Sequence, residues 1–249
     1  MMKQIAKLGL LLIMVGSMSA CSSTMRWKEE VKLHDGQVIV SERYYNLDGY
    51  AYLDSSERTA LNETVTFNLP GTDKKIIWKN DFSDKVPEQN SLNHFRFDIV
   101  NGMPYLATYP AGCIAYSKWG MPNPPQVLFK YEGDQWKRIT LAELPPELIG
   151  ATANVIVGRP ASSLLQSFYT VKGVDDKNYY ISTPEYKTIL REPISKAWDC
   201  GEMVYDGHGG WSGIGWFRRQ PSIEACLKYC EREKLPAQYC PCNKLFKGK

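Results

Sequence analysis

The chain has 249 residues, a formal net charge of +3 and 43% hydrophobic residues. A charge this close to neutral excludes an extended basic field for nucleic acid, and the scattered lysines and arginines form no basic stripe. The length is sufficient for one large β domain, or for one domain with a small appendage. The 7 Trp, 15 Tyr and 8 Phe residues favour β-sheets, in which such side chains pack well.

Residues 1–20 have the order of features of a secretory signal peptide. Lys3 and Lys7 make a short basic start, and residues 8–15 are almost continuously apolar. That run is well short of the roughly 20 residues that a membrane-spanning helix needs. The N-terminus is therefore predicted to be an export signal that is removed.

The stretch MSAC at residues 18–21 resembles a bacterial lipobox. The resemblance implies that Cys21 becomes the first residue and carries acyl chains, followed by a linker over 21–26. Several acyl chains on one residue anchor a protein stably. Ser22 after the cysteine implies, by the same resemblance, the outer membrane. The alternative is an ordinary signal peptide cleaved after Ala20, which leaves Cys21 as a free thiol.

Residues 27–219 are predicted to form a mainly β domain, an antiparallel meander of hairpins arranged as a sandwich or an open barrel. Four segments have a strand, a turn pair and a second strand, with apolar and polar residues alternating for part of their length. Asn101-Gly102 is the strongest of the turn signals. The other three turn pairs are Asp35-Gly36, Pro70-Gly71 and Gly133-Asp134.

The third hairpin predicts which face of the sheet is buried. Alternation predicts that six of its residues point to one face, and that only this face is buried. These residues are Phe95, Phe97, Ile99, Tyr105, Ala107 and Tyr109. A loose repeat of Trp-Lys pairs at residues 27, 78 and 136 leaves a small propeller as an alternative, although a propeller requires a clearer period.

The rest of the domain gives weaker signals. Glycines and prolines in 112–125 argue against regular structure there. Residues 143–150 are predicted to make at most one helical turn, and 153–158 a short strand. The segment 159–195 has a weak pattern, and its part 160–171 is equally compatible with a helix or a strand. The glycine-rich stretch 206–219 is predicted to be a hairpin or a loop.

Residues 220–249 are predicted to form a small, cysteine-rich helical appendage. Ser222 is a helix N-cap candidate, and Pro236 ends the helix. The helix places Cys226 and Cys230 on one face, because they are four residues apart.

The cysteines predict a set of disulfides. Apart from Cys21 there are six, an even number that an oxidising compartment would pair. Cys240 and Cys242 are two residues apart in a segment that is expected to be extended or to turn. If this segment folds back on the helix, the nearer cysteines pair with each other and the farther ones pair outside them, which predicts Cys230–Cys240 inside Cys226–Cys242. Cys113–Cys200 follows by elimination. The alternative is zinc bound by the last four cysteines, but their spacing is not a common zinc-knuckle spacing.

The candidates for catalysis are few. Asp206, His208 and Ser212 lie close in sequence, but a triad requires a fold that brings the three groups together. We therefore expect a glycine-rich turn with a solvated His208, and no catalytic residues. The sequence contains no P-loop, no dinucleotide-binding glycine motif, no HExxH and no EF-hand loop, and we expect no cofactor and no metal.

Three phrases resemble a group of uncharacterised proteobacterial proteins, many of which have lipoprotein signals. These phrases are WKEEVKLHDGQVIVSERYY, CIAYSKWGMPNPPQVLFKYEGDQWKRI and YKTILREP, within residues 27–195. The resemblance supports export and implies no activity or substrate. The phrase that holds Trp119, Asn123 and Pro124 is a candidate binding face, because aromatic residues in such a loop can stack on a sugar or hold a peptide.

These observations predict a protein held to the outer membrane by its N-terminal lipid and facing the periplasm. Its β-rich body is expected to be a non-enzymatic binding module for an envelope protein or a glycan, with no affinity for nucleic acid. The alternative is an envelope hydrolase with a site near His208. A third hypothesis is a stress or exclusion lipoprotein that acts by occupying a surface.

Overall fold

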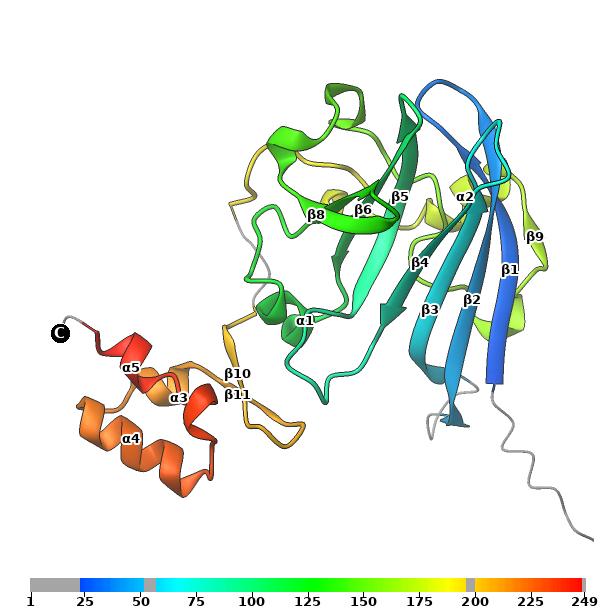
Figure 1. Cartoon of the computed structure of the whole chain (residues 1–249). Coiled ribbons are helices and arrows are strands. Elements are labelled where there is room, and N and C mark those ends of the chain that lie inside the picture. The colour runs from blue at the N-terminus through cyan, green and yellow to red at the C-terminus, as the bar shows by residue number, and fades with distance from the viewer. Residues whose placement is uncertain (1–22, 52–56, 196–199, 248–249) are drawn as a thin grey trace, which may run out of the picture.

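The structure is a computed structural model that describes residues 23–51, 57–195 and 200–247. It consists of a two-sheet body and a C-terminal appendage (Figure 1). One sheet has the strand order β4-β3-β2-β1-β9, and the other has the order β5-β6-β7-β8. The first sheet contains β1 (Ser23–Lys32), β2 (Val38–Ala51), β3 (Arg58–Asn68), β4 (Lys75–Asp81) and β9 (Phe168–Tyr169). The second contains β5 (Leu92–Val100), β6 (Met103–Pro110), β7 (Val127–Glu132) and β8 (Gln135–Ile139).

All four predicted hairpins are confirmed. They are β1–β2, β3–β4, β5–β6 and β7–β8, and each pairs antiparallel. Asn101 and Gly102 have φ angles of 51° and 74°. A two-residue turn with positive φ at both positions matches the twist of the strands that it joins, which explains why this turn signal is reliable.

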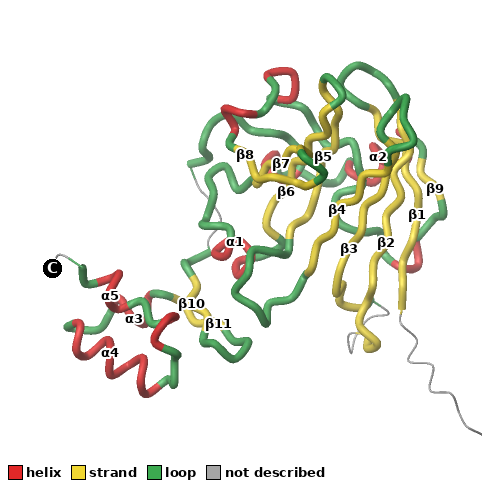
Figure 2. The backbone as a smooth tube through the Cα atoms, viewed as in Figure 1, coloured by secondary structure: helices red, strands yellow, loops and turns green. Residues whose placement is uncertain are grey.

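Over the described residues the two sheets pack against each other as a sandwich and form neither a closed barrel nor a propeller (Figure 2). Alternate residues of each sheet point inward and meet in one large apolar cluster. Val31, Val65 and Trp78 come from the first sheet, whereas Phe97 and Phe129 come from the second. The predicted mainly β class, with antiparallel sheets and a disulfide-linked helical end, is therefore confirmed.

The prediction of a single buried face for the third hairpin is wrong. The pairing of β5 with β6 shifts register between His94 and Arg96, so Phe95 faces the opposite side from Phe97. Phe95 and Ala107 belong to a second apolar cluster on the outer side of this sheet. Residues of the segment 141–157 and Ile189 cover that side. Both faces of β5 are therefore buried.

Two other local predictions are wrong, and one that the sequence left open is decided by the structure. Residues 112–125 are not wholly irregular, because α1 (Cys113–Lys118) lies within them. Residues 153–158 form no strand. The side chain of Asn154 accepts a hydrogen bond from the backbone N–H of Phe97 and donates one to the Phe97 carbonyl, so these backbone groups of β5 bond to a side chain and not to a neighbouring strand. The segment 160–171 contains both a 3-10 turn, Ser162–Leu164, and the short strand β9. The segment with a weak pattern that follows contains the helix α2 (Val171–Asn178).

The 3-10 turns at Leu141–Glu143 and Pro146–Leu148 agree with the prediction of at most one helical turn in 143–150. The prediction of a hairpin or a loop over 206–219 is correct in part: a hairpin is present, but its first strand precedes this stretch, and residues 215–218 form a short helix. The hairpin consists of β10 (Met203–Tyr205) and β11 (Trp211–Gly213).

The appendage follows this hairpin and contains α3 (Gly215–Arg218), α4 (Ile223–Arg232) and α5 (Cys242–Leu245). Ser222 caps α4, as predicted, by accepting a hydrogen bond from the Ala225 backbone. The apolar cluster of the appendage begins before residue 220, because it includes Val204, Ile214 and Phe217. The hairpin therefore contributes to the appendage as well as to the contact with the body.

The disulfides have the pairing expected from the sequence. They join Cys113 to Cys200, Cys226 to Cys242 and Cys230 to Cys240. The disulfide Cys113–Cys200 links α1 of the body to the segment before β10. Next to it, the Ser117 hydroxyl accepts a hydrogen bond from the Met203 backbone N–H and donates one to the Met203 carbonyl.

Candidate functional site

The proline-rich loop after α1 holds the residues that the sequence predicts as a binding face. Trp119 is 7% exposed, so the prediction is wrong for this residue. Its ring packs edge-on against Phe129 at 5.8 Å, and its Nε1 donates to the Asn90 carbonyl at 2.8 Å. Trp119 belongs to the core because burying its large ring beneath the loop removes a large apolar area from water.

Asn123 and Pro124 do lie at the surface, in one wall of a groove. The side chain of Asn123 accepts a hydrogen bond from the Ile194 backbone at 2.8 Å and donates to the Ile194 carbonyl at 3.1 Å. Gln126 makes a similar pair of bonds with Leu190 and Thr188. Two amide side chains thus fix the loop to the segment 188–194, so this wall is held in place by hydrogen bonds.

The opposite wall comes from β8 and the 3-10 turn that follows it. The groove has a volume of about 410 Å³. Its apolar lining includes Pro122, Pro124, Leu141 and Leu190, and its charged residues are Arg138 and Glu143. We call it the loop groove. An apolar cleft with few polar groups is the usual form of a binding site.

The two charged residues of the loop groove are oriented by local contacts. The guanidinium of Arg138 lies 5.5 Å from the centre of the Trp119 ring. The carboxylate of Glu143 accepts hydrogen bonds from the backbone and hydroxyl of Thr140, which lower the pKa of Glu143. The loop groove therefore offers one fixed negative and one fixed positive charge beside an apolar surface.

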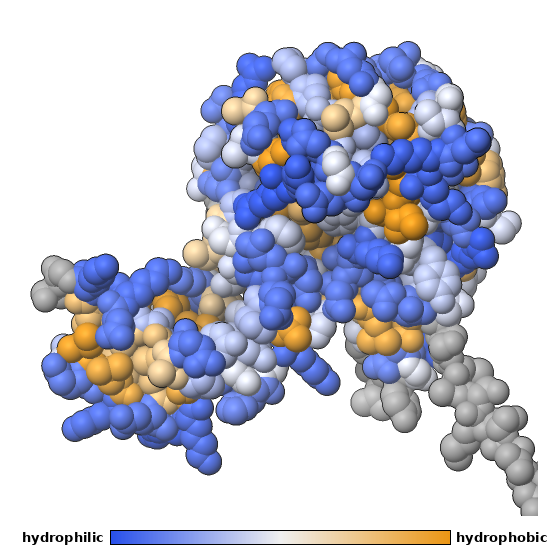
Figure 3. Space-filling model, viewed as in Figure 1, coloured by the Kyte–Doolittle hydropathy of each residue, from blue (hydrophilic) through white to orange (hydrophobic). Residues whose placement is uncertain are grey.

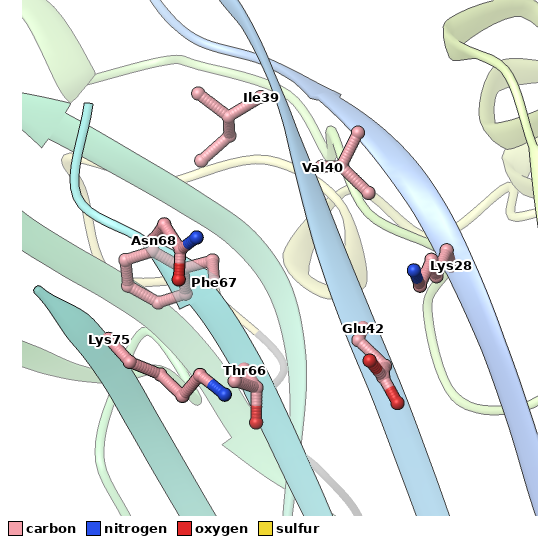
Figure 4. A pocket seen from close by; sticks show the side chains of 8 residues that line it. All are labelled: Lys28, Ile39, Val40, Glu42, Thr66, Phe67, Asn68 and Lys75. Atoms are coloured by element: carbon pink, nitrogen blue, oxygen red, sulfur yellow. The ribbon is translucent and has the colours of Figure 1, made fainter. Parts of the chain in front are cut away.

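A second groove of about 430 Å³ lies on the outer face of the first sheet (Figure 4). Its lining includes Lys28, Val40, Glu42, Thr66 and Lys75, which alternate along their strands with core residues. They are the solvent-facing residues of a half-buried sheet. The loop groove is the better candidate because one of its walls is a loop held on a rigid scaffold, where binding residues concentrate.

His208 lies on an exposed turn between β10 and β11. The Asp206 carboxylate accepts hydrogen bonds from the backbones of His208 and Gly210 at 2.7 and 2.8 Å, and these bonds lower its pKa. Ser212 lies within β11, paired with Val204. Asp206 therefore shapes the turn, and this geometry gives the hydrolase alternative no support.

A buried cluster of charged residues, which was not predicted from the sequence, lies beneath the first sheet. Arg43 is fully buried and donates to Glu63 at 2.9 Å and to the Tyr45 hydroxyl at 2.7 Å. Glu29, also fully buried, lies 3.5 Å from Arg43 and accepts a hydrogen bond from the backbone of Ile156 at 2.9 Å. The sequence does carry a signal for this cluster: Glu29, Arg43 and Glu63 occupy positions that alternation along their strands assigns to the buried face. Because the cluster is closed to solvent, we assign it to stability.

Glu63 gives the fold a measurable pH dependence. Burial alone would raise the pKa of Glu63, but the charge of Arg43 and the neighbouring His94 lower it from 4.5 to about 2. A depressed carboxyl pKa contributes stability that is complete above the unfolded-state pKa and is lost as pH falls toward the folded-state value. We expect Glu63 to account for a loss of about 3 kcal/mol in unfolding free energy between pH 4.5 and pH 2.

The measurement is urea denaturation of the wild type and of Glu63→Gln across that pH range. The variant is less stable at neutral pH, and its stability should fall less steeply with acid. Glu147→Gln is the control, since Glu147 is exposed. Parallel pH profiles for the wild type and Glu63→Gln would contradict the assignment.

The sulfur atoms of three cysteines in the appendage lie close enough to hold a metal ion. Those of Cys230, Cys240 and Cys242 are within 4.8 Å of one another. All three cysteines are in disulfides, and a disulfide sulfur is not the thiolate that zinc requires. The cluster as it stands is a covalent link between α4 and α5.

The predicted lipidation residue Cys21 lies outside the described residues. Within the described ranges, no helix is long and apolar enough to cross a membrane. Comparison of the chain with family models, curated proteins and solved structures finds no match.

Proposed function

We propose that this chain is a lipid-anchored protein of the bacterial outer membrane that faces the periplasm and binds another envelope component without catalysis. The observation that carries the proposal is the loop groove, in which Asn123 and Gln126 fix a proline-rich wall beside an apolar surface. The anchor rests on the signal peptide and the lipobox-like residues 18–21. The disulfides support an oxidising compartment.

The lining of the loop groove favours an extended protein segment as the ligand. Pro124, Leu141 and Leu190 offer apolar surface, while Arg138 and Glu143 can pair with charged groups or amides of a peptide. A glycan is the weaker alternative. Sugar stacking needs an exposed aromatic face, and Trp119, the aromatic residue of this loop, is in the core.

In-cell photo-crosslinking tests the proposal. A photoreactive amino acid replaces Leu141 in the loop groove, or, as the control, the exposed Ile77 on the outer face of the first sheet. We expect a defined envelope protein to be captured from position 141 and not from position 77. Arg138→Glu should weaken this capture, because it reverses the positive charge of the groove.

The same experiment tests the anchor. Cys21→Ala should release the protein from the membrane fraction, because acyl chains supply the membrane affinity. Identical captured species from positions 141 and 77 would contradict a specific groove. Retention of the Cys21→Ala protein in the membrane would contradict the lipid anchor.

A further inference from the structure

The end of the body at which β1 starts has a feature that anchoring alone does not require. Ser23 is the first residue of β1, and it pairs with Leu47 of β2. In Figure 1 this is the lower end of the body. Cys21 precedes Ser23 by two residues, which span at most about 7 Å even when fully extended. If Cys21 carries acyl chains, this end of the sandwich is held directly against the bilayer.

Two exposed leucines lie at this end. Leu61 is 47% exposed and adjoins Ala60, the partner of Leu47 in the sheet. Leu164 is 61% exposed and belongs to the 3-10 turn whose Ser162 hydroxyl lies 3.9 Å from the sulfur of Met25. We call these two leucines the basal rim. Apolar surface is also visible at the lower end of the body in Figure 3.

The turn that carries Leu164 is held in place. Leu165 packs on the cluster that contains Met25 and Trp27, and the Ser162 backbone donates to the Glu57 carboxylate at 2.8 Å. Leu164 therefore projects from a fixed turn beside the start of β1. In solution its exposure leaves apolar surface in water, and contact with acyl chains would remove that surface from water.

We propose that the basal rim, Leu61 and Leu164, inserts into the interface of the lipid bilayer and fixes the body in one orientation on the membrane. The inference rests on the proposed acylation of Cys21. Because Cys21 and Ser23 are only two residues apart, acyl chains on Cys21 would hold the basal rim next to the bilayer, so lipid is its expected partner. The interfacial layer into which apolar side chains insert is about 5–10 Å deep. Leu61 follows Ala60, which lies in register with Leu47 and Ser23, and Leu164 belongs to the turn beside Met25, so both lie at the end of the sheet where β1 starts.

The sheet itself supplies a matched control. Val38 is 47% exposed, as Leu61 is, but it pairs with Lys32 at the opposite end of β1. At about 3.3 Å per residue, a strand of this length places Val38 roughly 30 Å from the rim. The proposed orientation keeps Val38 out of contact with lipid.

The test uses the full-length acylated protein, purified from membranes and reconstituted into phosphatidylethanolamine and phosphatidylglycerol vesicles. A photoreactive amino acid replaces Leu61, Leu164 or Val38 in separate proteins, and mass spectrometry reads both the acylation of Cys21 and the cross-linked lipid. We expect lipid adducts from positions 61 and 164 and none from position 38.

The outcomes separate the two proposals. Acylated protein with no adducts at the rim, or with equal adducts at all three positions, would overturn the orientation and leave the anchor in place. Protein that lacks acyl chains on Cys21 would overturn the proposed anchor, and with it the orientation that rests on it.

Discussion

Arg43→Met is expected to lower the free energy of unfolding by about 3–5 kcal/mol, because it leaves buried carboxylates without their partner. Arg43 is fully buried, and its guanidinium contacts Glu29 and Glu63 and also lies 4.8 Å from the centre of the Trp27 ring. Methionine fills a similar volume, so the loss reports the charge pairing and not a large cavity. Urea denaturation followed by circular dichroism measures it.

Arg26→Met is the matched control on the neighbouring strand. Arg26 also pairs with a glutamate, Glu42, but its side chain is 65% exposed. Exposed ion pairs contribute at most about 1 kcal/mol, so this variant should retain nearly all of its stability. Equal losses for the two variants would show that the buried cluster has no special role.

The second large effect is expected in the appendage. Replacing Cys226, Cys230, Cys240 and Cys242 together by alanine should unfold α4 and α5 while the sandwich stays folded. The apolar cluster of the appendage is small, and three of its six buried residues are cysteines of these disulfides. A core this small cannot offset the entropy of ordering the chain without covalent links.

Hydrogen exchange measured by mass spectrometry reads the two parts separately. Amides of α4 should exchange at unprotected rates in the four-alanine variant, and those of β5 should keep their protection. The control is Cys113→Ala with Cys200→Ala, which leaves both appendage disulfides intact and should keep α4 protected. Slow exchange of α4 in the four-alanine variant would show that its apolar contacts suffice.

The hairpins of the sandwich were predictable because their signals are local. The turn pair Asn101-Gly102 adopts positive φ for reasons contained in those two residues. The nested disulfides were predictable for a similar reason, since a four-residue spacing on a helix places two sulfurs on one face. These features need no knowledge of distant parts of the chain.

The errors lie where distant segments decide the outcome. A register shift at Phe95 depends on pairing with β6, and nothing in the strand's own alternation marks it. Trp119 was expected on the binding face, but its environment comes from Phe129 and Asn90. The loop groove shares this property, because residues of its walls, Pro124 and Leu190, are far apart in sequence.

Strand β5 has a consequence for how the sequence can vary. Every residue from His94 to Val100 is buried, because two apolar clusters occupy opposite sides of the strand. In β4, the strand that precedes β5 in the chain, every second side chain can change at little cost in stability, since those side chains meet water. β5 has no such freedom although it lies at the edge of its sheet, so we expect mutational tolerance to be lowest there and higher in strands that keep one face in water.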